Sequence, residues 1–190
     1  MKTIKFLTLI TSISVFLFSC SSDDDGTPPE PVNEEEVITT LSLTLTPQGG
    51  GTAITFTSQD LDADGPNPPN VNVENLAPNT MYMGVVEVLN ETETPAEDIT
   101  EEVAEEDDEH QFFFQVIGGA NITTTYTDAD DDGNPIGINF TLMTGDASTG
   151  NMVVTLRHLL DKFGAGVSDG NITNAGGDTD VEVTFPITIQ

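Results

Sequence analysis

Two short acidic loops have the residue spacing of calcium-binding loops. They read DLDADG (60–65) and DADDDG (128–133), and both fit D-x-D-x-D-G. Carboxylates at positions 1, 3 and 5 can converge on one calcium ion, and the glycine at position 6 allows a sharp turn. An EF-hand has a bidentate Glu at position 12, where this chain has Val71 and Asn139, so neither loop is an EF-hand. We therefore predict a structural calcium site in each loop, with a solvated acidic turn as the alternative; the ligands would be Asp60, Asp62, Asp64, Asp128, Asp130 and Asp132.

The two histidines are the second set of candidate ligands. His110 ends an acidic run, and His158 ends a strand-like segment. Imidazole combined with carboxylate suits zinc, copper or iron, and the acids nearest in sequence are Glu105, Glu106 and Glu109. No i, i+3 or i, i+4 spacing joins the histidines. Exposed histidines at strand ends are therefore the alternative.

Catalytic patterns are weak in this sequence. GVSDG (166–170) fits the hydrolase pattern G-x-S-x-G, but both histidines precede Ser168, whereas the hydrolase histidine follows its serine. Pairs of carboxylates could act on glycosides, yet the chain has no Trp and only two Tyr to stack against sugars. We predict that the protein is not an enzyme.

The charge of the chain excludes two classes of partner. It has 33 acidic and four basic residues among 190, and the formal net charge is −29. Such a surface repels nucleic acid and anionic lipid headgroups. It attracts cations instead.

The elements that must position these side chains are short strands. Nine segments alternate apolar and polar residues and are bounded by Gly, Pro, Asn or Asp, which is typical of β-strands. They are 41–46, 52–58, 71–76, 83–88, 112–117, 122–127, 136–142, 152–157 and 181–189. This pattern predicts an all-β domain over 37–190, an immunoglobulin- or fibronectin-like sandwich of eight or nine strands. LAPNTMY (76–82) resembles the Pro-containing turn before a late strand of fibronectin-type sandwiches.

One short acidic helix is also expected. Thr94 can cap its start, Pro95 suits the first helical position, and Glu97 completes a capping box. Ile99 and Val103 would form its apolar edge. The charged run over 101–110 places the rest of the helix on the surface.

The chain contains a possible internal duplication. With an offset of 68 residues, TAITFTSQDLDADG (52–65) aligns with ANITTTYTDADDDG (120–133), and the acidic loops coincide. Such a repeat predicts two related four-strand units closed by a last strand. The two acidic loops would then occupy equivalent positions and could lie at one end of the sandwich.

The N-terminus has the features of a lipoprotein signal peptide. Two lysines precede an apolar run over 6–18, which is too short to span a membrane stably. Leu17 and Ser19 then stand at positions −3 and −1 of a lipobox whose acylated residue would be Cys20, the only cysteine. Cleavage after residue 19 would leave a net charge of −31. An ordinary secretory signal is the alternative, and residues 20–36 would form an acidic disordered tether.

The sequence resembles a group of bacterial surface lipoproteins. SSDDD after Cys20 is similar to the export signal that sends Bacteroidetes lipoproteins to the outer face of the outer membrane. The stretches 98–115 and 176–190 resemble small lipoproteins of that phylum labelled "type 1 periplasmic binding fold superfamily". The resemblance implies an acyl-anchored surface protein of uncharacterised function. The label implies a two-lobed fold of alternating strands and helices, whereas the residues predict a sandwich.

The predicted function is therefore non-catalytic. We expect an outer-membrane lipoprotein with a calcium-stabilised β-sandwich that acts as a binding or adhesion accessory. The alternative is a metal- or nutrient-capture accessory to an outer-membrane transporter, with His110, His158, Glu106 and Glu109 as ligands.

Overall fold

A computed structural model describes residues 36–62 and 65–190. These residues belong to one compact unit, Glu35–Gln190. The predicted signal peptide, Cys20, the tether up to residue 35 and the predicted ligand Asp64 lie outside the described residues. Within the described residues, no helix is long and apolar enough to cross a membrane.

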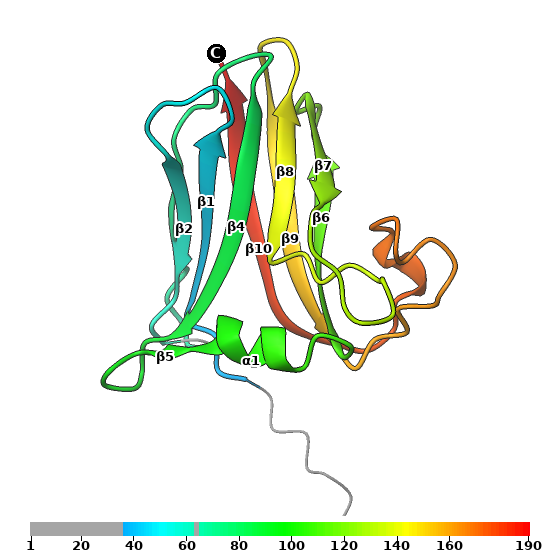
Figure 1. The fold of residues 1–190 in the computed structure, drawn as a ribbon. Coiled ribbons are helices and arrows are strands. Elements are labelled where there is room, and N and C mark those ends of the chain that lie inside the picture. Colours follow the sequence, from blue (N-terminus) through cyan, green and yellow to red (C-terminus); the bar gives the residue numbers. More distant parts are fainter. Residues whose placement is uncertain (1–35, 63–64) are drawn as a thin grey trace, which may run out of the picture. The chain divides into compact units, whose positions relative to one another are not determined.

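The described residues form a sandwich of two antiparallel sheets (Figure 1). The larger sheet has the order β3-β2-β1-β4-β8-β7, with β5 beside β4, and the smaller has the order β10-β9-β6. The strands are β1 (Thr40–Pro47), β2 (Ile54–Gln59), β3 (Asn70–Asn72), β4 (Met81–Asn90), β5 (Glu97–Asp98), β6 (His110–Ile117), β7 (Ile122–Tyr126), β8 (Asn139–Thr144), β9 (Ser148–His158) and β10 (Asp178–Ile189). The predicted all-β sandwich is confirmed, and all nine predicted strand segments overlap observed strands. Its immunoglobulin-like type stays a prediction.

Alternation along the strands builds the core. Leu41, Leu43 and Leu45 point from β1 into the space between the sheets and are fully or almost fully buried. Phe56 of the larger sheet meets Phe185 of the smaller, with ring centroids 5.8 Å apart. Burying such side chains stabilises the fold by about 1.5–3 kcal/mol each.

The helix begins later than predicted. It is α1 (Ile99–Glu105), and its N-cap is Asp98, whose carboxylate accepts a hydrogen bond from the backbone N–H of Thr100 at 3.0 Å. The predicted start at Thr94 is wrong because Glu97 and Asp98 pair with β4 as the short strand β5. The predicted apolar edge is confirmed, since Ile99 and Val103 are both buried. Figure 1 shows α1 across the end of the sandwich where β1 begins and β9 ends.

The predicted Pro-containing turn has a specific anchor. The hydroxyl of the buried Tyr82 accepts a hydrogen bond from the backbone N–H of Ala77 at 2.9 Å. A tyrosine that bonds to the backbone a few residues upstream is typical of a tyrosine corner in β-sandwiches.

Strand pairing follows the predicted duplication only in part. The pairs β1–β4 and β2–β3 have the counterparts β6–β9 and β7–β8. In contrast, β1 pairs with β2, whereas β6 and β7 lie in different sheets. The register also differs: Leu89 pairs with Thr40, but Arg157, 68 residues after Leu89, pairs with Gln111 instead of residue 108. The duplication therefore stays a prediction.

The segment between β9 and β10 covers the outer face of the smaller sheet. Its residues Leu160, Val167 and Ala175 bury Phe113 of β6 in a small second cluster. The GVSDG pattern lies in this segment and is followed by the short 3-10 helix Ile172–Asn174. Its role there is packing, because Val167 is fully buried.

Candidate metal centre

The strand register brings the two histidines together. His110 is the first residue of β6, His158 is the last residue of β9, and the two are direct partners. Their rings stack with centroids 4.2 Å apart and an interplanar angle of 17°. His110 is 0% exposed and His158 is 4% exposed. The alternative of exposed strand-end histidines is therefore wrong.

Two buried carboxylates face the imidazoles. One Glu36 oxygen, Oε1, lies 3.7 Å from both His110 Nε2 and His158 Nδ1. The oxygens of Asp180 lie 3.9 Å from His110 Nε2 and 4.0 Å from His158 Nδ1. The Glu36 side chain is 7% exposed and that of Asp180 is 2% exposed. Glu36, the last residue of the predicted tether, thus packs beside the histidines of the folded domain.

A break in the register of β10 accompanies the inward position of Asp180. Thr179 pairs with Arg157 and Val181 pairs with Leu156, so Asp180 is an extra residue between them. A bulge of this kind re-aims side chains. Strict alternation with Val183 would place Asp180 on the outer face, whereas its carboxylate lies beside the inward histidines.

Two of the predicted acids lie at the rim of this cluster. Glu106 Oε2 is 4.0 Å from His110 Nδ1, and Glu109 Oε2 is 3.6 Å from His158 Nε2. Their side chains are almost half exposed. The third predicted acid, Glu105, is exposed at the end of α1. Glu106 and Glu109 are therefore peripheral to the buried group of His110, His158, Glu36 and Asp180.

The protonation state of His110 suits a metal ligand. Its Nδ1 lies 3.1 Å from the backbone carbonyl of Glu106, which can only accept, so Nδ1 carries a hydrogen. Burial lowers the pKa of His110, and nearby His158 adds to this, although the Glu106 carbonyl and the acids Glu36 and Glu106 act in the opposite direction. The ring is thus held neutral with the lone pair on Nε2, the nitrogen that faces Glu36 and Asp180. A ligating histidine whose other ring nitrogen donates to a carbonyl is a common arrangement in metal sites.

Several polar atoms in the cluster lack a hydrogen-bond partner. His110 Nε2, His158 Nδ1 and Glu36 Oε2 are buried and make no hydrogen bond in the described structure. Buried polar atoms without partners destabilise a fold. The two basic side chains of residues 36–190 bond elsewhere: Lys162 to Asp130, and Arg157 to Thr179. A cation between the imidazoles and carboxylates would satisfy these atoms.

The spacing of the cluster fits one metal ion. Ligand atoms from Glu36, Glu106, His110 and His158 all lie within 4.8 Å of one another. Ligands about 2.0–2.1 Å from a tetrahedral zinc ion lie about 3.3 Å apart, so the separations of 3.7–4.0 Å around Glu36 and Asp180 need only a small contraction. The cluster can therefore hold a metal, as predicted in general terms. Its imidazoles favour zinc, copper or iron over calcium, which takes oxygen ligands.

The acidic loop 128–133 is engaged by protein donors. The Asp128 carboxylate accepts hydrogen bonds from the backbone N–H groups of Gly137 and Asn139. Asp130 Oδ2 lies 3.1 Å from the Lys162 ammonium, and Asp130 Oδ1 accepts from the backbone of Asp132 and Asn134. Two of the three predicted calcium ligands in this loop thus have partners within the protein.

In the loop 60–65, of which residues 60–62 and 65 are described, Leu61 and Asp62 are exposed. Asp62 accepts a hydrogen bond from the Asn67 side chain at 2.6 Å. The pKa of Asp62 is lowered by hydrogen bonding with Asp60 first and Asn67 second. Both acidic loops leave the larger sheet at the same end, because antiparallel pairing makes β2 and β7 run in the same direction. They are far apart in the strand order, however, so they do not share one site. Calcium binding by either loop stays a prediction.

Sequence reasoning missed Glu36 and Asp180, and it left open whether the histidines meet. One signal for the histidines is present in the sequence, because His110 is in phase with Phe112 and Phe114. His158 is likewise in phase with Leu156 and Val154. Period-2 alternation places residues of one phase on one face, so both histidines could be assigned to the core face.

No known protein family matches this chain, and neither a curated protein nor a solved structure does. The site is therefore interpreted from its own geometry.

Proposed function

We propose that this protein is a surface lipoprotein that captures a divalent first-row transition metal, with zinc as the first ion to test. The observation that carries the proposal is the buried group of two stacked imidazoles and two carboxylates. The metal would serve an outer-membrane transporter as partner. The lipobox at Cys20 and the acids after it support an acyl anchor and display at the cell surface.

The ligand set favours holding a metal over catalysis with it. Catalytic zinc sites have three protein ligands and keep a position open for water or substrate, whereas closed sites fill all four. Here Glu36, Glu106, His110 and His158 can supply four ligands, and Asp180 lies within 4.0 Å of both imidazoles. The proposed role is therefore non-catalytic capture.

The adhesion function with calcium-stabilised loops remains a separate prediction. It has less support, because Asp128 and Asp130 are bonded to protein donors.

Isothermal titration of the chelator-treated protein with Zn²⁺ tests the proposal. We expect one zinc per chain, and His110→Ala or His158→Ala should each weaken binding by at least about 100-fold, since loss of even an outer-shell partner costs about 10–100-fold. Glu36→Gln should weaken it too. Glu105→Gln is the matched control, because this acid is exposed on the same end of α1, and it should leave binding unchanged.

Co²⁺ in place of Zn²⁺ provides a second measurement. A tetrahedral site of nitrogen and oxygen ligands should give visible absorption that His158→Ala abolishes. Weak binding of several ions per chain, insensitive to both histidine substitutions, would contradict the proposal and indicate general attraction to the acidic surface.

A further inference from the structure

Three of the four methionines among the described residues lie on the outer face of the larger sheet. Met81 and Met83 belong to β4, and Met143 belongs to β8. They are 38%, 51% and 41% exposed, whereas the fourth, Met152, is fully buried in the core. Alternation along β4 sends Tyr82, which lies between the first two, into the core instead. Packing between the two sheets therefore does not account for the three exposed methionines.

The pairing of β4 with β8 brings these methionines together. Met81 and Met143 are direct partners, and Met83 is the diagonal neighbour of Met143. The backbone N–H of Thr144 donates to the carbonyl of Thr80 at 3.0 Å, so the next pair along, Met81 with Met143, is a non-hydrogen-bonded pair. In such a pair the Cα atoms are about 4.5 Å apart and the side chains lie closest. Diagonal neighbours, at roughly 7–8 Å, are still within reach of long side chains, so the three sulfur atoms can converge on one point.

The strand neighbours of these methionines carry no charge. Met83 lies between Thr46 of β1 and Thr141 of β8. Met143 has Thr123 of β7 as its other partner. In a chain with 33 acidic residues, the paired positions around the methionines thus supply no carboxylate. Calcium and magnesium, which take oxygen ligands, are not favoured here.

We propose that Met81, Met83 and Met143 form a binding site for a soft monovalent cation, Cu(I), held by three thioether sulfurs. Soft thiolate and thioether ligands select Cu(I), whereas carboxylates and carbonyls suit magnesium, calcium and manganese. A methionine side chain has three rotatable bonds and a polarizable sulfur. The three sulfurs can therefore turn towards one ion without a change in the backbone.

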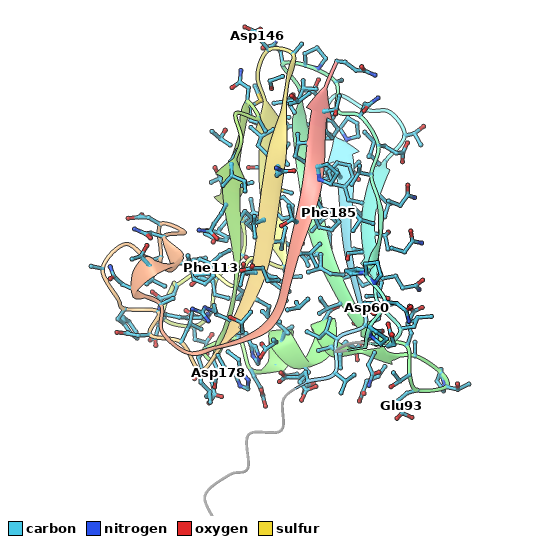
Figure 2. The ribbon with its side chains drawn as sticks, turned by 180° about the vertical axis from the view of Figure 1, so that it is seen from behind. Asp60, Glu93, Phe113, Asp146, Asp178 and Phe185 are labelled. Atoms are coloured by element: carbon cyan, nitrogen blue, oxygen red, sulfur yellow. The ribbon has the colours of Figure 1, made fainter. Side chains whose placement is uncertain are left out.

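This site is separate from the metal centre at the histidines. Figure 2 labels Asp146, three residues after Met143, at one end of the sandwich and Asp178 at the other. Asp178 is the strand partner of His158. The inference does not depend on the proposed zinc capture, and the two sites can be tested independently. Because imidazole also binds copper, the test must distinguish the two ends.

Methyl NMR of the protein labelled with [¹³C-methyl]methionine tests the proposal residue by residue. Single Met→Leu variants assign the signals. Anaerobic titration with Cu(I), kept reduced by ascorbate, should shift the signals of Met81, Met83 and Met143 and reach saturation at one Cu(I) per chain. The signal of the buried Met152 should not move. Zn²⁺ and Ca²⁺ at the same concentration should leave all four signals unchanged.

Competition with the chromophoric Cu(I) chelator bicinchoninate measures the affinity. Met81→Leu, Met83→Leu and Met143→Leu each keep an apolar side chain of similar volume and remove the sulfur, a swap that folds usually tolerate. Each should weaken Cu(I) binding by at least about 10-fold, since loss of even an outer-shell partner of a metal ligand costs about 10–100-fold. Val85→Leu is the matched control, because Val85 lies on the same face of β4 and is 44% exposed. It should leave Cu(I) binding unchanged, as should His158→Ala.

Three results would overturn the proposal. Unchanged Cu(I) affinity in the triple Met→Leu variant would indicate that this face serves only as an apolar contact surface. Loss of Cu(I) binding in His158→Ala, with full retention in the triple variant, would place the ion at the histidines. Equal methyl shifts from Zn²⁺ or Ca²⁺ would remove the selectivity of the site for a soft ion. A failure of zinc to bind at the histidines would contradict the proposed function and leave this site standing.

Discussion

Two groups of buried carboxylates in this protein are neutralised in different ways. Asp130, with a side chain 2% exposed, has the ammonium of Lys162 at 3.1 Å. Lys162 also donates to the backbone carbonyls of Asp107 and Pro135. Glu36 and Asp180 are comparably buried, but they face two imidazoles at 3.7–4.0 Å.

Asp130 thus has a permanently charged partner, whereas Glu36 faces imidazoles among the described residues. Burying a charge is unfavourable unless it is paired, and Lys162 supplies the pair for Asp130 permanently. His110 cannot do the same for Glu36 because burial lowers its pKa and keeps the ring neutral. The loop 128–133, which fits a calcium pattern in sequence, thus receives a cation from Lys162, whereas the group around the histidines could hold a metal.

Removing the ammonium group of Lys162 should give the largest effect on the free energy of unfolding. Lys162→Met keeps most of the side-chain volume but leaves Asp130 buried and unpaired, which should lower the free energy of unfolding by about 3–5 kcal/mol. Urea unfolding at pH 7 measures this. Asp130→Asn in the same background should recover part of the loss, and a double variant no more stable than Lys162→Met alone would contradict the pairing.

Lowering the pH should reduce the difference in unfolding free energy between wild type and Lys162→Met. Burial by itself would raise the pKa of Asp130, but hydrogen bonds from the Asn134 backbone and from Lys162, with the Lys162 charge, bring it below its ordinary value. A lowered folded-state pKa stabilises the protein above the unfolded pKa of about 3.9, and that stabilisation is lost as the pH falls through the folded value. The difference in unfolding free energy should therefore be larger at pH 7 than at pH 3.

Binding of zinc to the cluster around His110, His158 and Glu36 should give the next largest effect on stability. Zinc at 100 times its dissociation constant would add about 2.7 kcal/mol. For a domain of this size the melting temperature should then rise by roughly 5–10 °C. Differential scanning calorimetry should show this rise in wild type and in Lys162→Met but not in His110→Ala. A rise that survives His110→Ala would place zinc elsewhere.

Calcium should give the smallest effect on the melting temperature. We expect it to act only through the loop 60–65, because Lys162 pairs with Asp130 in the other acidic loop. At a concentration near a millimolar dissociation constant, calcium would add about 0.4 kcal/mol and raise the melting temperature by about 1–2 °C. Asp62→Asn should abolish this rise, whereas Asp132→Asn should not. If Asp132→Asn abolished it, the loop 128–133 would bind calcium in spite of Lys162, and the contrast between the two loops would disappear.

The fold could be predicted well from local patterns, and the site only in part. Alternating segments found the strands because side-chain direction in a strand repeats every two residues. The helix start was wrong because Glu97 and Asp98 pair with β4, a contact that capping preferences do not include. His110 and His158 could be placed on core faces from their phase with Phe112 and Leu156, but only the register of β6 and β9 makes them partners.

The sequence by itself determined the all-β class, the acidic character and the residue types available as ligands. These depend on composition and on short-range periodicity. Only the tertiary structure decided that Glu36, His110, His158 and Asp180 meet, because they come from four distant parts of the chain. The extra residue in β10 illustrates the physical reason: one inserted residue changes the face on which a side chain lies, and strict alternation cannot anticipate it.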